Sequence, residues 1–323
     1  MKEGWICRDY RVGDEYRILT LFQEVFGKEM SLAFWKWRFK ENPFGEGIVK
    51  LLFDDDKLIG HYAVTPVNTQ VEGRLVRAVF SLTTMTHPDY AGQGIFTYLA
   101  EVTYKLSDEK GYHFVYGFPN KNSYHAFTRK LGWCDSGEMT SLEKSLRTDT
   151  RTNLVTKGIK KIECFGDSLN ALWDKVKQDY AIIVPRSKEF LNWRFTENPD
   201  TEYIKCLILD GDDVLGYLVL KIYQTGDMMK GHIVDLLSVP EADVVRSLLK
   251  WSQSYFLEKS THDISCWVPE KSLYANVLRE EGFHRQGTET YFGTRVFKEA
   301  GVLSKSVEQF ANWHLTMADS DVF

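Results

Sequence analysis

The sequence lacks the features that mark several classes of protein. Its five cysteines are widely spaced and form no CxxC pair, so neither a disulfide framework nor a zinc site is indicated. No run approaches the roughly eighteen apolar residues that span a bilayer, and the charged start, MKEGWICRDY, differs from a secretion signal. We therefore expect a cytoplasmic protein with no membrane partner.

A strong excess of one charge is also missing. Lysine and arginine together number 40, aspartate and glutamate 45, and the formal net charge is −5. The basic residues are scattered among acids, so the sequence gives no electrostatic footprint for a nucleic acid. The triplet Asp54-Asp55-Asp56 is expected to cap a hairpin turn and to bind no metal. The 323 residues are enough for two buried cores.

An internal repeat organises the chain. SLAFWKWRFKENP at 31–43 returns as SKEFLNWRFTENP at 187–199, LLFDDDKLIGHYAV at 51–64 as LILDGDDVLGYLVL at 207–220, and KNSYHAFTRKLGW at 121–133 as KSLYANVLREEGF at 271–283. Because the tryptophan and arginine of WRF recur in both copies, we expect them to pack the turn. The repeat indicates one supersecondary plan written twice.

Each copy predicts a helix, a turn, a hairpin, a longer strand, a helix, a strand and a last helix, which is an α/β order with a mixed, mostly antiparallel sheet flanked by helices. In the first copy we expect a helix at 95–108, a buried strand at 113–118 and a helix at 123–130. The polar stretch at 147–155 is expected to be a linker between domains at 1–146 and 156–298, followed by a tail at 299–323.

The loop YAGQGIF, at 90–96, carries the clearest chemical signal. It leaves a predicted strand and opens a predicted helix, so its glycines can turn backbone N–H groups toward an anion while the helix N-terminus adds positive potential. A pyrophosphate would fit there. A glycine pair that only makes a tight strand-to-helix turn is the other interpretation of this pattern.

With TMTHPDYAGQGIF and FPNKNSYHAFTRKLGW, the chain resembles the GCN5-related N-acetyltransferase (GNAT) superfamily, and in its two copies the tandem-domain, Eis-like members. The resemblance implies two tandem GNAT-like domains and acetyl-CoA as co-substrate. It implies that the strand before the loop binds pantetheine and that the loop binds pyrophosphate. Ala91 and Phe96 depart from the usual loop pattern Gln/Arg-x-x-Gly-x-Gly/Ala. The implied cofactor-binding residues are Met85, Thr86, His87, Gly92, Gln93, Gly94, Ile95, Phe96 and Asn120.

Acyl transfer to an amine needs a base for the ammonium proton and an acid for the departing thiolate. The position where the superfamily often has a tyrosine is Thr128, and the nearest phenol is Tyr124, which we name as the candidate acid. The matching Tyr274 of the second copy favours a packing role instead. The strand at 81–87 has no glutamate, so we expect the tail to fold back and to place Asp319, Asp321 or the carboxylate of Phe323 in the acceptor pocket of the first domain. A tail that only covers apolar surface is the competing interpretation.

The second copy replaces the loop with LLSVPEADVVRSLL, which has no glycine and cannot easily present N–H groups to a pyrophosphate. The hypothesis is therefore an acyl-CoA-dependent N-acyltransferase with one cofactor site, acting on a primary amine of a small molecule, amino sugar or peptide. A non-catalytic binding module on the same scaffold is the alternative from another class. An aminoacyl transferase using charged tRNA is disfavoured by the acidic net charge. Assembly of several copies stays open.

Overall fold

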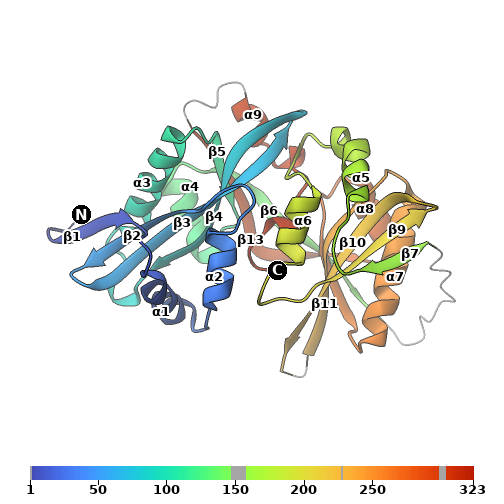
Figure 1. The fold of residues 1–323 in the computed structure, drawn as a ribbon, viewed down its shortest axis with the longest axis horizontal. Coiled ribbons are helices and arrows are strands. Elements are labelled where there is room, and N and C mark those ends of the chain that lie inside the picture. The colour runs from blue at the N-terminus through green and yellow to red at the C-terminus, as the bar shows by residue number, and fades with distance from the viewer. Residues whose placement is uncertain (1, 147–157, 227, 298–302) are drawn as a thin grey trace. The chain divides into compact units, whose positions relative to one another are not determined.

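The computed structural model describes residues 2–146, 158–226, 228–297 and 303–323 (Figure 1). By contacts, the chain divides into two compact units. The first, unit 1, comprises Met1–Gly137, Asn198–Asp200 and Thr290–Phe310. The second, unit 2, comprises Glu138–Glu197, Thr201–Glu289 and Ala311–Phe323.

These units differ from the simple halves expected at 1–146 and 156–298. Strand β13 (His284–Val296) pairs antiparallel with β5 (Phe114–Gly117) inside unit 1, while β6 (Cys134–Ser145) pairs with β12 (Asp263–Trp267) inside unit 2. Each unit thus takes a strand from the far part of the chain. The expected linker at 147–155 and the first tail residues, 299–302, lie outside the described residues.

Unit 1 is a mixed sheet with strand order β1-β2-β3-β4-β5-β13, in which only β4 and β5 pair in parallel. The remaining strands and helices of this unit are β1 (Trp5–Asp9), α1 (Glu15–Phe26), α2 (Leu32–Phe39), β2 (Ile48–Asp54), β3 (Lys57–Val71), β4 (Arg74–Thr86), α3 (Ile95–Glu109), α4 (Lys121–Lys130) and α9 (Ser304–Val307).

Helices α3 and α4 cover one face of this sheet. Leu99 and Tyr104 of α3 and Phe127 of α4 join one buried cluster with Tyr62 of β3. The adjacent strand residue, His61, points to the opposite face, where its ring meets that of Phe39 of α2 at 6.2 Å between centroids. Figure 1 shows α1 and α2 on the side of β3 away from α3.

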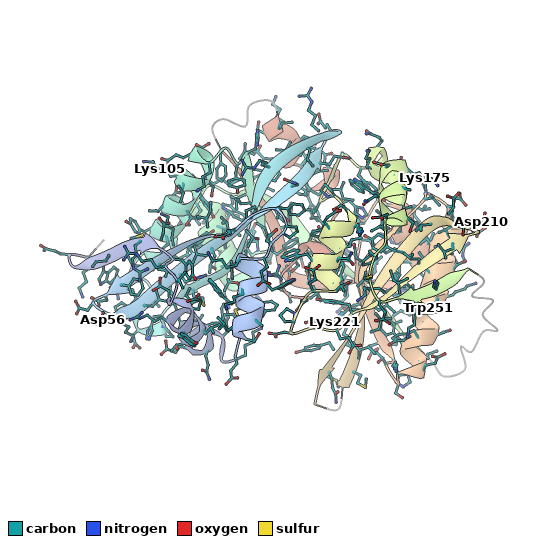
Figure 2. The ribbon with its side chains drawn as sticks, in the orientation of Figure 1. Asp56, Lys105, Lys175, Asp210, Lys221 and Trp251 are labelled. Carbon is teal, nitrogen blue, oxygen red and sulfur yellow. The ribbon has the colours of Figure 1, made fainter. Side chains whose placement is uncertain are left out.

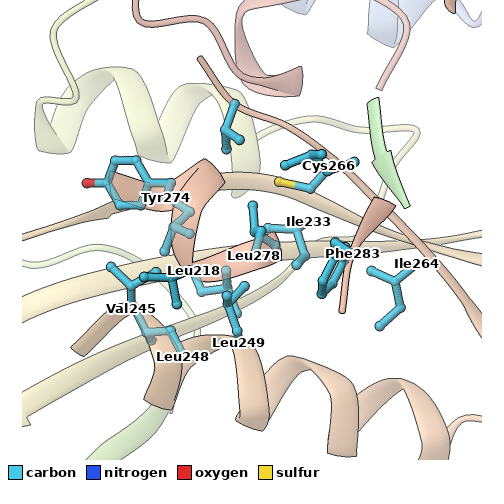
Figure 3. Packing of buried hydrophobic residues seen from close by; sticks show 14 of the residues in the cluster. Leu218, Ile233, Val245, Leu248, Leu249, Ile264, Cys266, Tyr274, Leu278 and Phe283 are labelled. Atoms are coloured by element: carbon cyan, nitrogen blue, oxygen red, sulfur yellow. The ribbon is translucent and has the colours of Figure 1, made fainter. Parts of the chain in front are cut away.

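Unit 2 repeats the plan with strand order β6-β12-β11-β10-β9-β7. Its core packs α7 and α8 against the sheet through aliphatic side chains such as Leu218, Leu249 and Leu278 (Figure 3). The elements of this unit are β7 (Ile159–Ile162), α5 (Ser168–Val176), β8 (Ile182–Ile183), α6 (Lys188–Phe195), β9 (Ile204–Asp210), β10 (Asp213–Thr225), β11 (Met228–Ser238), α7 (Ala242–Glu258) and α8 (Leu273–Glu280).

The repeated SxxxxxWRF motif forms α2 and α6. Ser31 and Ser187 are the N-caps, and their hydroxyls accept hydrogen bonds from the backbone N–H groups of Phe34 and Phe190. The tryptophans and arginines of both motifs are buried, as expected of packing residues. The tandem α/β fold predicted from the repeat, with a mostly antiparallel sheet in each part, is confirmed.

Candidate active site

The glycine loop of unit 1 has an open backbone. Gly92 and Gly94 adopt left-handed φ angles of 77° and 79°, and Gly94 is the N-cap of α3. A Cβ built on either residue would meet nothing within 4 Å, so the backbone conformation requires glycine and crowding does not. Ala91 to Gly94 are exposed. The first N–H groups of α3 have no partner within the helix and are available to an anion in front of it.

Gly60 brings this helix end close to the sheet. A Cβ at Gly60 would lie 2.5 Å from Ile95 and 2.9 Å from Leu99, both on α3. Because only glycine leaves that room, Gly60 sets how near the start of α3 comes to β3 and to the end of β4. Gly60 pairs with Thr86, the last residue of β4, so the loop begins at this same place.

Strand β4 is irregular where the loop approaches. His61 of β3 pairs with Met85 and Ala63 with Leu82, so Thr83 and Thr84 together stand opposite one residue, which defines a β-bulge. Thr83 takes a left-handed φ of 51°. The parallel pairing with β5 ends at Ser81, and in the described register β4 continues beyond it with no partner on that side. The described pairing of β4 with β5 therefore covers Val79 to Ser81 and stops short of the bulge.

A row of buried hydroxyls, not predicted from the sequence, lies beside the bulge. The Tyr62 hydroxyl lies 2.8 Å from Ser81 Oγ and is also hydrogen-bonded to the Tyr104 hydroxyl, which accepts from Trp133 Nε1 at 3.0 Å. Burial raises the pKa of both phenols, so they stay neutral at pH 7. These side chains come from β3, β4, α3 and the turn before β6. They form no linear motif, so the sequence could not predict this row of hydroxyls.

The predicted cofactor residues of β4 differ in exposure. Met85 is buried, Thr86 is half-buried and His87 is buried. His87 caps the turn that follows: its Nδ1 accepts from the N–H of Asp89 at 3.2 Å, and its Nε2 lies 3.5 Å from a carboxylate oxygen of Glu24. The imidazole of His87 is therefore occupied in shaping the loop.

Tyr124 and Asn120 lie at the start of α4. The side-chain oxygen of Asn120 is the N-cap, accepting from the N–H groups of Asn122 and Ser123. Tyr124 is half-buried, and its ring packs on that of Tyr291 at 4.3 Å between centroids. The predicted site residues of unit 1 thus come from the end of β4, the loop, the start of α3 and the start of α4.

A comparison of sequences bears on this arrangement. Residues 7–134, from β1 to the start of β6, match the family described as the acetyltransferase (GNAT) domain. Unit 1 contains a GNAT acetyltransferase domain. The matched residues include the end of β4, the glycine loop, Asn120 and Tyr124. The match confirms the expected enzyme class, N-acetyltransferase, for this domain. No curated protein matches the chain in sequence.

Solved structures share the fold of the whole chain at low sequence identity. A GCN5-related N-acetyltransferase from Anabaena variabilis has a TM-score of 0.71 at 14% identity, covering 90% of this chain and 72% of that one. One from Kribbella flavida scores 0.65 at 14% identity, covering 90% and 71%. N-myristoyltransferase of Saccharomyces cerevisiae with bound myristoyl-CoA and inhibitors scores 0.63 at 10% identity, covering 92% and 80%. GNAT acyltransferases use acyl-CoA, and the chain has their fold.

In the described residues of unit 2, the segment after β11 has no open glycine loop like that of the GNAT domain. Ser238 stands opposite Gly216 of β10, as Thr86 stands opposite Gly60 in the GNAT domain. The hydroxyl of the buried Tyr274 accepts from the Ser238 N–H at 3.1 Å and lies 3.3 Å from the Ser238 carbonyl oxygen. The position that matches the predicted pantetheine-binding strand is therefore occupied by a protein side chain.

The end of the chain is held within unit 2. A carboxylate oxygen of Phe323 accepts from Arg194 and from the Tyr203 hydroxyl, and the Phe323 ring packs on that of Trp267 at 4.9 Å between centroids. Asp321 is half-buried. The fully buried Arg186 binds Asp319 with two nitrogens at 2.9 and 2.8 Å and also contacts Asp235. Asp319, one of the groups expected in the acceptor pocket, therefore has a structural partner in Arg186.

No cluster of His, Cys, Asp or Glu that could hold a metal is found in the described part of the chain. Asp55 and Asp56 are exposed in the turn between β2 and β3, where Figure 2 labels Asp56. In the same described residues, no helix is long and apolar enough to cross a membrane.

Proposed function

We propose that the chain transfers the acyl group of an acyl-CoA, with acetyl-CoA as the first candidate, to a primary amine of a small molecule, amino sugar or peptide. The observation that carries the proposal is the open loop at Gly92 and Gly94 in front of α3, beside a strand whose end is unpaired on one side. A diphosphate would bind the loop N–H groups, and the pantetheine arm would follow the end of β4 at Met85 and Thr86.

In the proposed reaction, the neutral amine attacks the thioester carbonyl carbon, and a C–N bond forms. The C–S bond then breaks, and the thiolate leaves with the electron pair. One proton leaves the amine and one reaches the thiolate, so the sum is an amide and free CoA. Tyr124 is our candidate for the second proton, and Asp321 or Phe323 for the group that holds the acceptor amine.

A thiol-release assay tests the proposal. Acetyl-, octanoyl- and myristoyl-CoA are each offered with a panel of amino sugars, polyamines and peptides, and free CoA is measured with a thiol reagent. Binding should first appear as a raised melting temperature, since a ligand at one hundred times its Kd stabilises by about 3 kcal/mol. Thermal stabilisation without thiol release would favour the non-catalytic module, and neither signal with any acyl-CoA would contradict the proposal.

A further inference from the structure

His61 is a buried side chain of the GNAT domain that the proposed reaction does not yet use. It lies on β3 and is 1% exposed. Its Nδ1 is 2.8 Å from the carbonyl oxygen of Thr83, the residue at the β4 bulge. Its Nε2 is buried and has no hydrogen-bond partner among the described residues. The imidazole is therefore bonded to the bulge through Nδ1.

The direction of that bond follows from the charge of the ring. Burial lowers the pKa of His61 to about 4, so the imidazole is neutral at pH 7 and carries one ring proton. A carbonyl oxygen can only accept. The proton is accordingly assigned to Nδ1, which donates to Thr83, and Nε2 is left as an acceptor.

Thr83 needs such a restraint. Its φ of 51° is unfavourable for a β-branched residue, and such a conformation persists only where the surroundings hold it. If the bond from His61 were lost, the register on both sides would keep the extra residue in β4, but the Thr83 carbonyl would be free to turn. The backbone of Thr83 and Thr84 would then no longer be fixed for a ligand.

We propose that His61 is a positioning residue of the acyltransferase reaction, which fixes the β4 bulge through its hydrogen bond to Thr83. The fixed bulge keeps the backbone of Thr83 and Thr84 out of the β3 ladder, next to the end of the parallel pairing with β5. Backbone N–H groups fixed in advance are what a thioester carbonyl needs as negative charge develops on its oxygen. This inference rests on the proposed function.

Two variants separate the bond from simple packing. His61→Leu fills similar space without a donor, whereas His61→Asn keeps an N–H donor at about the place of Nδ1. We expect His61→Leu to lower kcat on the order of tenfold or more, with the Kd for acetyl-CoA within about threefold of wild type. We expect His61→Asn to recover most of that loss.

Asn42, in the turn after α2, offers a matched control because it binds the backbone of the same strand, β3. Its buried side chain donates to the carbonyl oxygen of Pro66 at 3.1 Å, away from the bulge. Asn42→Leu should lower the melting temperature as much as His61→Leu does, and it should leave kcat unchanged. Activity is measured well below the melting temperature of each variant.

Equal kcat in wild type and His61→Leu would overturn the inference, as would equal losses of kcat in His61→Leu, His61→Asn and Asn42→Leu. Failure of the proposed function looks different, because wild type itself would then release no CoA with any amine. If His61→Leu does not fold, His61→Ala, which also lacks a donor, takes its place. Equal kcat in His61→Ala and His61→Asn would contradict the account.

Discussion

At the scale of single residues, the phenol of Tyr124 is the candidate proton donor. Tyr124→Phe removes only the hydroxyl and keeps the ring on Tyr291. We expect kcat to fall about a hundredfold, with the Kd for acetyl-CoA unchanged, because a proton donor acts on the leaving thiolate and not on binding. Stopped-flow thiol release and calorimetry measure the two quantities.

Tyr291→Phe is the control for this prediction, since it removes a neighbouring hydroxyl and keeps the same ring contact. It should leave kcat unchanged. Full turnover in Tyr124→Phe would mean that water or another group protonates the thiolate.

The burial of His314 in unit 2 predicts how the stability of the protein depends on pH. Burial, with a smaller effect of Arg186, lowers the pKa of His314 to about 3, so the folded protein keeps this ring neutral. The unfolded chain takes up a proton near pH 6.5. The contribution of the neutral His314 ring to the free energy of unfolding is thus fully present above about pH 6.5, and it is lost as the pH falls toward 3.

His314→Phe should remove the contribution of His314 to the pH dependence of the free energy of unfolding. Between pH 7 and pH 5 the variant should lose about 2 kcal/mol less of its free energy of unfolding than wild type does. Urea titrations at the two pH values measure this difference. His262, which is exposed, is replaced by phenylalanine as the control for loss of an imidazole outside the core. An equal loss in wild type and His314→Phe would mean that His314 is protonated in the folded state.

Among single residues, some features of the candidate site could be predicted from the sequence and others could not. The glycine loop was predictable because left-handed glycines before a helix follow from local chain geometry. The link from His61 to Thr83 was not, because it joins two strands and depends on a one-residue bulge that no local pattern encodes. Likewise, a lone histidine is by itself no signal.

At the scale of elements, the segment after Ala311 is held by a buried ionic cluster. Burial alone would lower the pKa of Arg186, but Asp235 and Asp319 outweigh it and raise that pKa, so the guanidinium stays charged. The bond from Thr316 to Asp235 adds a second attachment at 2.8 Å. Removal of residues from Asp319 onward would therefore disturb unit 2 as well as any catalytic role of Asp321 or Phe323.

This cluster predicts a large effect on stability. Asp319→Ala leaves a buried arginine with one carboxylate partner fewer, and breaking a buried pair typically costs about 3–5 kcal/mol. Urea unfolding measures the change. Asp167→Ala removes the exposed partner of Lys188 and should leave the midpoint nearly unchanged. A small effect of Asp319→Ala would mean that water or Asp235 satisfies Arg186.

A shorter deletion tests the catalytic role of the tail without breaking that cluster. Removal of residues 321–323 keeps Asp319 and Thr316 and takes away Asp321 and the Phe323 contacts with Arg194 and Tyr203. If the tail holds the acceptor amine, kcat/KM for the amine should fall at least tenfold, with acetyl-CoA affinity unchanged. Full activity would refute a role of Asp321 or Phe323 in the reaction.

Elements were easier to predict than their partners. The hairpins and the helices around the loop follow from alternating apolar residues, acidic turns and amphipathic spacing, which act over a few residues. The pairing of β13 with β5 and of β6 with β12 joins segments far apart in the chain. No local sequence pattern predicts that β13 joins the sheet of unit 1 and β6 that of unit 2.

At the scale of the whole chain, two copies of one plan have diverged at the same place. The GNAT domain ends β4 in an open glycine loop, whereas unit 2 ends β11 in a backbone that the Tyr274 hydroxyl already binds. The absence of glycine from residues 236–249 made this divergence predictable. The substitute bond from Tyr274 was not predictable, because the matching residue of the first copy is also a tyrosine.

Isothermal titration of acetyl-CoA into wild type and into Gly94→Asp tests the central claim most directly. Gly94 has a left-handed φ and open space beside it, so aspartate brings strain and negative charge to the loop where the pyrophosphate would bind. We predict one site per chain in wild type and at least tenfold weaker binding in Gly94→Asp, with circular dichroism unchanged. Two sites per chain, or unchanged affinity in Gly94→Asp, would contradict the account.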